Sequence, residues 1–411
     1  MPRPALGLLA MLSAATSLSQ FWRAALGVIA PDLVRDLGLS AQMLGSANAA
    51  FFIALGLLQI PIGMMFDRWG ARLTVALLCA AAVVGALLHA TSHGATQTVL
   101  AHFLVGIGNA ASFMATVYLC SRWFSGERLT GALSWVFALS QLGILFAATP
   151  LALASATLGW RWAFVVMGAA SGLVGLLFWL LVRDDPPDRI VPPRRRETFF
   201  EVLRGLIAVW RTPGLAAVLA MHAFAYGSMA VVIGLWASPY LADVYGLDAV
   251  ARGNVVLAMG IAQLVGILAI GPLDRLLNTR KWIVVPGATG SIAVLAALAL
   301  GHDLPLWLAI TLLIALCAIT TYGIVIVAHG RSLFPDHLAG RGVTTVNLAQ
   351  VFGLTVLPIL TGWVIGQVSH GAMPAPELAY RSAFGSIGLC LSAGLLVYLF
   401  AKDAPPRRRG G

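Results

Sequence analysis

The sequence contains few charged residues. Aspartate, glutamate, lysine and arginine make up 10% of the 411 residues, whereas 59% are hydrophobic and the mean hydropathy is +0.89. Soluble domains carry about 25% charged residues, because polar side chains must cover their surface. The shortage excludes a soluble protein. It predicts a polytopic all-α membrane protein with enough length for roughly a dozen spans of about 20 residues.

Motifs for cofactor and metal chemistry are missing as well. The 4 cysteines are far apart and lie in apolar segments, which argues against a disulfide framework or a zinc site. The sequence has no HExxH, GxSxG or Walker motif, and Gly106-Ile-Gly108 falls inside an apolar segment without a nucleotide-binding context. We therefore expect that the protein is not an enzyme and that it uses no metal ion or cofactor.

Apolar runs fill the chain between short polar breaks. The first run begins near the N-terminus like a signal peptide, but it continues to Ala30 and more apolar sequence follows, so we expect a retained span. The runs predict twelve transmembrane helices at about 6–30, 46–66, 73–91, 97–120, 129–153, 162–182, 213–240, 252–273, 282–300, 304–328, 342–367 and 381–401.

Lysine and arginine are unevenly distributed between the two sides of such a membrane protein. With the N-terminus in the cytoplasm, 21 of the 26 basic residues lie on the cytoplasmic side and 4 on the outer side, while Arg23 lies within a span. The positive-inside rule therefore places both termini in the cytoplasm. The net charge of +10 follows from this topology, so we expect no nucleic-acid partner.

The two halves of the chain are related. A proline- and charge-rich stretch predicts a cytoplasmic linker at 183–211 between an N-terminal six-helix bundle at 1–182 and a C-terminal six-helix bundle at 212–411. Three pairs of segments align without gaps, and the first pair also places Gln141 opposite Gln350: Arg122–Gly131 with Arg331–Gly340, Arg161–Phe164 with Arg381–Phe384, and Arg183–Pro187 with Lys402–Pro406. Parallel half-repeats predict a substrate site at their interface near the bilayer midplane.

A glycine- and arginine-rich loop joins the second and third predicted spans. Its sequence, Gly63-Met-Met-Phe-Asp67-Arg68-Trp-Gly70-Ala-Arg72, resembles the signature loop of the major facilitator superfamily. In that family the acidic and basic residues of the loop act in a cytoplasmic gate. The resemblance implies this role for Asp67, Arg68 and Arg72, while Gly63 and Gly70 permit close helix approach. A degenerate copy after the eighth span contributes Asp274 and Arg275 as further gate candidates.

Three other features are similar to the same family: Gly106-Ile-Gly108, Ala147–Pro150 and Gly159–Phe164. The resemblance covers essentially the whole chain. It implies a secondary transporter with two pseudo-symmetric bundles that rock around a central cavity, most similar to bacterial permeases for organic anions and sugar phosphates, in the inner membrane and as a monomer. The first helix of each three-helix unit would line the cavity. Polar residues in the spans then give candidate substrate-binding residues: Gln20, Arg23, Asn109, Gln141, His222, Tyr226, Gln263, Asn347 and Gln350.

Arg23 is the charged residue that lies well inside a predicted span, whereas all 16 acidic residues fall in loops or at helix ends. A charge in the membrane is a functional-site hypothesis. Without a carboxylate to compensate it, this cation favours an anionic ligand, and guanidinium binds carboxylate or phosphate in a two-pronged geometry. We therefore expect transport of a small organic anion, a carboxylate or a phosphate ester.

Coupling and the alternatives remain open at this stage. His102 and His222 are the buried groups expected to titrate near neutral pH, so they are candidates for proton coupling. One alternative is an efflux permease for neutral or amphiphilic compounds, with Arg23 extended outward beside Trp22 in the interfacial aromatic belt. A second alternative is a membrane sensor of transporter fold that binds without moving its ligand.

Overall fold

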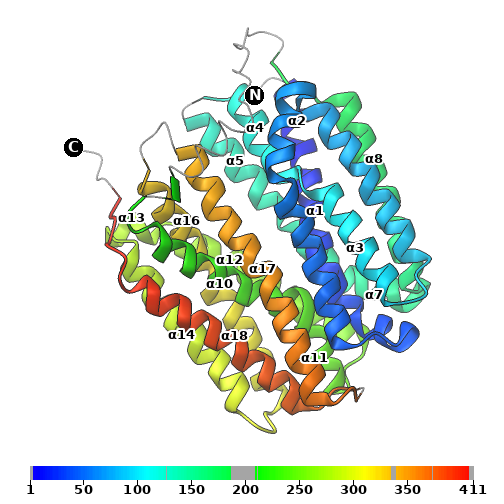
Figure 1. Cartoon of the computed structure of the whole chain (residues 1–411). Coiled ribbons are helices and arrows are strands. Elements are labelled where there is room, and N and C mark those ends of the chain that lie inside the picture. The colour runs from blue at the N-terminus through cyan, green and yellow to red at the C-terminus, as the bar shows by residue number, and fades with distance from the viewer. Residues whose placement is uncertain are drawn as a thin grey trace. The chain divides into compact units, whose positions relative to one another are not determined.

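The computed structural model describes residues 3–125, 127–186, 209–210, 212–334, 339–372 and 374–406, and every regular element in these ranges is helical (Figure 1). The first half contains α1 (Arg3–Leu37), α2 (Ala41–Ala90), α3 (Ala95–Asn109), α4 (Ser112–Trp123), α5 (Glu127–Ser140), α6 (Leu142–Ala147), α7 (Thr149–Leu158) and α8 (Trp160–Leu181). The second half contains α10 (Leu215–Val231), a π-helical turn (Val232–Trp236), α11 (Ala237–Asp243), α12 (Ala249–Ile270), α13 (Leu273–Leu277), α14 (Lys281–Leu300), α15 (Leu306–Ile319), a 3₁₀ turn (Thr320–Tyr322), α16 (Gly323–Ser332), α17 (Ala339–Ser369) and α18 (Glu377–Tyr398).

Eleven continuous helical stretches of the described chain are long and apolar enough to cross a membrane. One of them, α2, has 50 residues, whereas about 20 residues suffice for one crossing. Gly70 interrupts α2 with φ 79° and ψ 165°, a conformation that residues with a Cβ rarely adopt. The helices on either side of Gly70 are therefore two spans, and the twelve predicted membrane helices are confirmed.

The first predicted span ends later than its apolar run. α1 continues through Pro31 to Leu37, although the apolar run stops at Ala30. Asp32 and Asp36 lie on this extension, where Asp32 accepts a hydrogen bond from Ser155 and Asp36 accepts one from Trp160, both at 2.8 Å. These contacts fix the polar end of α1 to α7 and α8.

The chain folds into two compact units. The first consists of Met1–Leu39, Ser46–Arg196 and Asp248–Leu257, and the second of Ser40–Gly45, Glu197–Leu247 and Ala258–Gly411. The boundary between Arg196 and Glu197 falls in the predicted linker 183–211, of which residues 187–208 and 211 lie outside the described residues.

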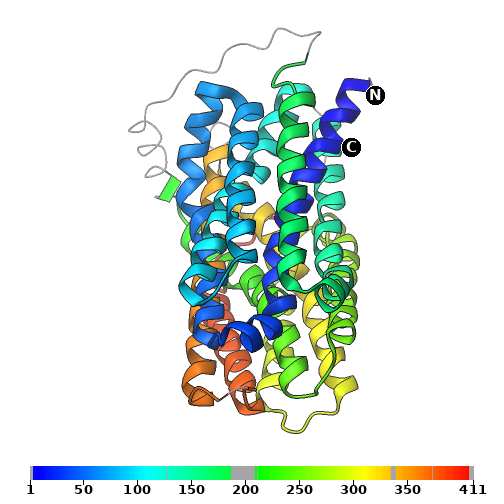
Figure 2. The ribbon, with the colours of Figure 1, turned by 90° about the vertical axis from the view of Figure 1, so that its right-hand side faces the viewer.

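In the first unit, α1 is the central helix, since it packs against α3, α4, α5, α6, α7 and α8. Figure 2 shows α1 in dark blue beside α8 in green. The approach of α1 to α6 is so close that a Cβ on Gly143 would overlap the backbone oxygen of Ser17. Because glycine lacks this atom, the two backbones can pack directly and bring polar side chains of α1 toward the α5–α6 junction.

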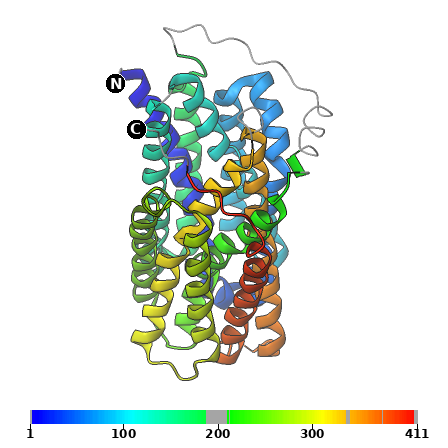
Figure 3. The ribbon, with the colours of Figure 1, turned by 90° about the vertical axis from the view of Figure 1, so that its left-hand side faces the viewer.

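In the second unit, α10 has a similar position. It packs against α16, α17 and α18, and Figure 3 shows α17 in orange beside α18 in red. A Cβ on Gly353 of α17 would overlap the backbone oxygen of Ala223 in α10. In both units, therefore, glycine permits close approach of another helix to the first long helix.

Two arginines at aligned positions of the repeat make equivalent contacts. Arg161, at the start of α8, donates to the backbone oxygen of Ser92, just after α2. Arg381, near the start of α18, donates to the backbone oxygens of Ala299 and Leu300 at the end of α14. In both units the arginine thus ties the last long helix to the C-terminal end of the third span.

Candidate functional site

Arg23 lies on α1 and is partly buried. Its Nε is inaccessible and has no hydrogen-bond partner in the described part of the chain. The guanidinium carbon lies 5.6 Å from the ring centre of Phe52. No described carboxylate forms an ion pair with Arg23, whereas Arg35, near the end of the same helix, is paired with both Asp32 and Asp36. The guanidinium of Arg23 therefore lies over the ring of Phe52, and its Nε–H remains available to donate a hydrogen bond to a ligand.

Two of the predicted residues beside Arg23 are in direct contact. Nε2 of Gln20 donates a hydrogen bond to Oε1 of Gln141 at 3.0 Å. Gln20 precedes Arg23 by three residues, so the two side chains share one face of α1. Gln141 is buried at the junction of α5 and α6. Gln20 and Gln141 therefore form a polar pair in the first unit, and Gln20 lies on the same face of α1 as Arg23.

Asn109, the fourth predicted residue of this unit, lies at the end of α3. Its Nδ2 donates to the backbone oxygen of Val105 at 2.8 Å, one turn earlier in the same helix. The side chain is 3% exposed, so it is satisfied within its own helix in this structure. Oδ1 remains its acceptor for a ligand group.

Trp22 faces away from any lipid-exposed surface of the first unit. The side chain is fully buried, stacks on Phe164 at 5.7 Å and donates through Nε1 to Oγ of Ser171 at 3.4 Å. It therefore does not belong to an interfacial belt of lipid-facing aromatic rings, which the efflux alternative requires.

The remaining predicted substrate residues belong to the second unit. His222 and Tyr226 lie one turn apart on α10, and Asn347 and Gln350 lie three residues apart on the neighbouring α17. His222 is 2% exposed, and neither of its ring nitrogens has a hydrogen-bond partner among the described residues. Gln263 lies on α12, where its buried Oε1 has no hydrogen-bond partner among the described residues.

His102 has a partner that the sequence reasoning missed. Nδ1 of His102 and Nε2 of His89 are 3.1 Å apart, and both side chains are fully buried. The expectation that His102 and His222 are the buried histidines was therefore incomplete. His89 lies in the predicted span 73–91, and this placement was the signal that could have identified it.

The gate candidates at the Gly70 break within α2 make few contacts with each other. Asp67 is partly buried and Arg68 is exposed, and neither forms an ion pair among the described residues. Arg72 instead contacts the end of α8: its Nε donates to the backbone oxygen of Trp179, and its backbone N–H donates to Asp184 at 2.8 Å. A Cβ on Gly63 would have open space, with its nearest neighbour at 4.0 Å.

Gly70 is required for the contact that Asp184 makes. A Cβ at Gly70 would overlap the carboxylate of Asp184, and its φ of 79° also requires glycine. Burial raises the pKa of Asp184, and this effect outweighs the hydrogen bonds from the backbone of Arg72 and Ala71, which lower it. The neighbouring Asp185 pairs with Arg122 of α4. The end of α8 therefore binds both the start of the third span and the end of the fourth.

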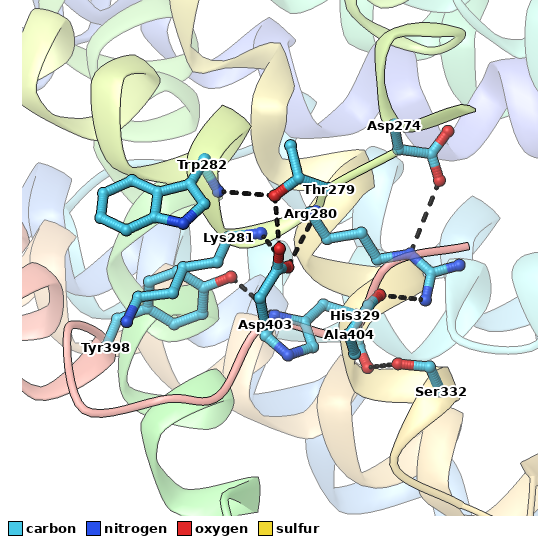
Figure 4. Close-up of polar contacts among 10 residues, drawn as sticks. All are labelled: Asp274, Thr279, Arg280, Lys281, Trp282, His329, Ser332, Tyr398, Asp403 and Ala404. Carbon is cyan, nitrogen blue, oxygen red and sulfur yellow. Dashed lines mark hydrogen bonds and ion pairs between the residues drawn. The ribbon is translucent and has the colours of Figure 1, made fainter. Parts of the chain in front are cut away.

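Figure 4 shows the corresponding region of the second unit. Oδ1 of Asp403 accepts hydrogen bonds from the backbone N–H groups of Arg280 and Lys281, at 3.0 and 2.9 Å, and Oδ2 accepts one from Thr279 at 2.6 Å. Burial raises the pKa of Asp403, but the combined hydrogen bonds hold it below its usual range. Asp274 pairs with Arg280 at 3.5 Å, and Arg275 is exposed.

The sequence that folds into these two units matches the profile of one known family. The profile of the Major Facilitator Superfamily matches residues 12–329 and 221–411. The chain belongs to this superfamily. It is an integral membrane transporter, as predicted, and not an enzyme.

The names of curated relatives of this major facilitator transporter refer to different kinds of substrate. A protein of Escherichia coli strain K12, "Probable L-galactonate transporter", is 29% identical over 165 residues, which are 39% of this chain and 36% of that protein. The "Quinolone resistance transporter" of Acinetobacter baumannii is 30% identical over 173 residues, 40% of this chain and 39% of that protein. The matched stretches thus span well under half the length of each relative.

Solved structures extend the likeness to almost the whole chain. The crystal structure of a nucleoside transporter superposes with a TM-score of 0.76, covers 97% of this chain and 100% of its own, and is 14% identical in sequence. At this identity the likeness shows the fold alone. The predicted major facilitator fold of this transporter is thereby confirmed.

Proposed function

We propose that the protein moves a small organic anion, a carboxylate or a phosphate ester, across the bacterial inner membrane by alternating access, with both termini in the cytoplasm and as a monomer. The observation that carries the proposal is the guanidinium of Arg23, which has no described carboxylate partner. A partly buried cation without a counter-ion gains most from an anionic ligand.

The polar residues around Arg23 suit the rest of such a substrate. Gln20 and Gln141 already form one hydrogen bond with each other at 3.0 Å, and their remaining donors and acceptors can bind hydroxyl groups. The second unit by itself carries polar groups of similar kinds on two packed helices: His222, Tyr226, Asn347 and Gln350. A polyhydroxylated acid such as L-galactonate, for which one relative is named, carries both kinds of group.

The efflux alternative keeps one supporting observation, the relative named for quinolone resistance. The burial of Trp22 counts against its version in which Arg23 and Trp22 reach the membrane interface. The charge of the ligand distinguishes anion transport from efflux of neutral or amphiphilic compounds. An unpaired cation adds little to the binding free energy of an uncharged or amphiphilic compound.

The experiment is a thermal-shift screen of the purified protein with L-galactonate, glucose 6-phosphate, galactose as the neutral sugar and ciprofloxacin as the quinolone. We expect the two anions to raise Tm, and Arg23→Gln to remove this shift. Arg128→Gln removes the same charge at an exposed position and should leave the shift intact. A response to ciprofloxacin that survives Arg23→Gln would support the efflux alternative instead.

Uptake into proteoliposomes completes the test. We expect wild-type protein to accumulate labelled L-galactonate or glucose 6-phosphate and Arg23→Gln to lose this uptake without loss of protein. Arg23→Lys retains the charge without the two-pronged geometry, so it should retain a small part of the activity. Unimpaired transport by Arg23→Gln would refute the anion site, and binding without uptake would indicate a sensor.

A further inference from the structure

The buried pair of His89 and His102 has unused hydrogen-bonding capacity. His89 lies at the end of α2 and His102 on α3, and one hydrogen bond of 3.1 Å joins Nε2 of His89 to Nδ1 of His102. Nδ1 of His89 and Nε2 of His102 are inaccessible and have no hydrogen-bond partner in the described ranges. A buried polar atom without a partner is costly to maintain, and such atoms often mark functional groups.

The protonation states of the pair follow from its geometry. A neutral imidazole has one N–H donor and one acceptor nitrogen. When one ring donates to the other, the outward nitrogen of the donor ring is an unpaired acceptor, and that of the acceptor ring is an unpaired N–H donor. One added proton binds the unpaired acceptor. The pair then carries one positive charge and two outward N–H donors, which require acceptors such as water, a carbonyl or an anion.

Packed rings connect His89 with one side of Arg23. The imidazole of His89 stacks on Phe164 of α8, with ring centres 4.3 Å apart and planes 6° apart. Phe164 stacks in turn on Trp22 at 5.7 Å, and Trp22 is the neighbour of Arg23 in α1. A continuous series of ring contacts therefore connects His89 with the turn of α1 that carries Arg23.

A second path connects His102 with the other side of Arg23. The imidazole of His102 lies 5.6 Å from Phe51, which contacts Phe52 at 5.2 Å. The guanidinium of Arg23 lies over Phe52. The histidine pair and Arg23 are thus joined through α2 as well as through α8 and α1.

Charged side chains on the helices around the pair have other partners. Arg161 of α8 contacts the backbone oxygen of Ser92 and stacks on Trp160. Asp36 of α1 is held by Trp160 and Arg35. No carboxylate in the described part of the chain forms a hydrogen bond or ion pair with either histidine. The pair therefore has no built-in counter-ion, and its charge state depends on what enters the unit.

We propose that the His89–His102 pair is the proton-binding site of this transporter and binds one proton together with one anionic substrate. The proposal rests on the proposed role of Arg23 in binding that substrate. A proton on the pair adds a second positive charge to a unit in which no described carboxylate pairs with Arg23 or with either histidine, so the protonated form binds an anion more tightly. By reciprocity the bound anion also favours the proton. One proton and one monovalent anion move together without net charge.

The first test needs no substrate. Hydrogen–deuterium exchange of the purified full-length protein is compared between pH 7.5 and 5.5, after correction for the intrinsic pH dependence of exchange. We expect faster exchange in peptides covering residues 85–105 at the lower pH, because the charged pair must open to find acceptors. His89→Gln with His102→Gln should remove this difference, while exposed His93→Gln should retain it. Equal exchange at both pH values in wild-type protein would overturn the proposal.

The second test measures L-galactonate affinity against pH. We expect the wild-type Kd to fall toward tenfold per pH unit of acidification, the limit for one linked proton, and each single histidine variant to flatten this slope. A wild-type Kd independent of pH, or an unchanged slope in the double variant, overturns the proton site. Arg23→Gln reports separately on the anion site, because it should abolish binding at every pH. If wild-type protein binds no anion, the proposed function fails, and the exchange measurement alone decides whether the pair binds a proton.

Discussion

Asp184 and Asp403 make the same hydrogen-bonded contact in the two units. Asp184 accepts a hydrogen bond from the backbone N–H of Arg72 at 2.8 Å, and Asp403 accepts one from that of Lys281 at 2.9 Å. Each aspartate follows the last long helix of its unit and binds the first turn of the third span. Free N–H groups at a helix N-terminus favour a carboxylate there. The aligned segments Arg183–Pro187 and Lys402–Pro406 thus form equivalent contacts in the two units.

The first prediction concerns these two carboxylates. Asp184→Ala or Asp403→Ala leaves partly buried backbone N–H groups without this acceptor, which costs up to about 1–3 kcal/mol. We expect each variant to lower the Tm of the purified protein by a few degrees. Asp303→Asn, at an exposed loop position with φ 53° that asparagine also adopts, removes a carboxylate of this kind without backbone strain and should have little effect. Unchanged Tm in both variants would show that the contacts do not stabilise the fold.

The two carboxylates should respond to acid in opposite directions. The pKa of Asp403 is lowered in the folded state, so its stabilising contribution is present above its unfolded pKa of about 3.9 and is lost as the pH falls through the folded value. The pKa of Asp184 is raised, so its contribution is greatest at low pH and is lost as the pH rises through the folded value. In Tm measurements from pH 6 to 3, the Tm deficit of Asp403→Asn should therefore shrink toward acid, and that of Asp184→Asn should grow. The same trend in both variants would contradict this assignment.

Gly143 and Gly353 should tolerate no side chain. A Cβ would overlap the backbone oxygen of Ser17 in the first unit and that of Ala223 in the second. Overpacking of this kind costs about 1–3 kcal/mol, so we expect Gly143→Ala and Gly353→Ala to lower Tm and the yield of folded protein. Gly131→Ala is the control, because nothing lies within 4 Å of its Cβ position. Equal stability of all three variants would mean that the helices can move apart freely.

Gly70 and Gly63 form a matched pair within the signature loop. Gly70→Ala places a Cβ on the carboxylate of Asp184 at a backbone conformation with φ 79°. We expect a loss of Tm and of uptake in proteoliposomes, since the turn between the second and third spans must distort. Gly63→Ala meets only a methyl group at 4.0 Å and should remain close to wild type. If Gly63→Ala is the more damaging change, close approach at Gly63 in another state of the transport cycle would explain it.

Much of the fold was predictable because its signals are local. Apolar runs of membrane length, the basic residues of the loops and the aligned segments of the two halves act through composition and short spacing. The end of α1 was not predictable in the same way. Pro31 and Asp32 suggested that the helix stops, but hydrogen bonds from Ser155 and Trp160 hold its extension to Leu37.

The sequence alone determined that this is a twelve-span transporter with Arg23 in a span and no acidic residue to pair with it there. Only the tertiary structure decided what each polar group contacts. Gln20 meets Gln141 across 121 positions, and His89 meets His102 because α2 and α3 fold side by side. Hydropathy fixes which segments enter the membrane, whereas pairs between distant segments depend on helix rotation and close packing, which hydropathy does not encode.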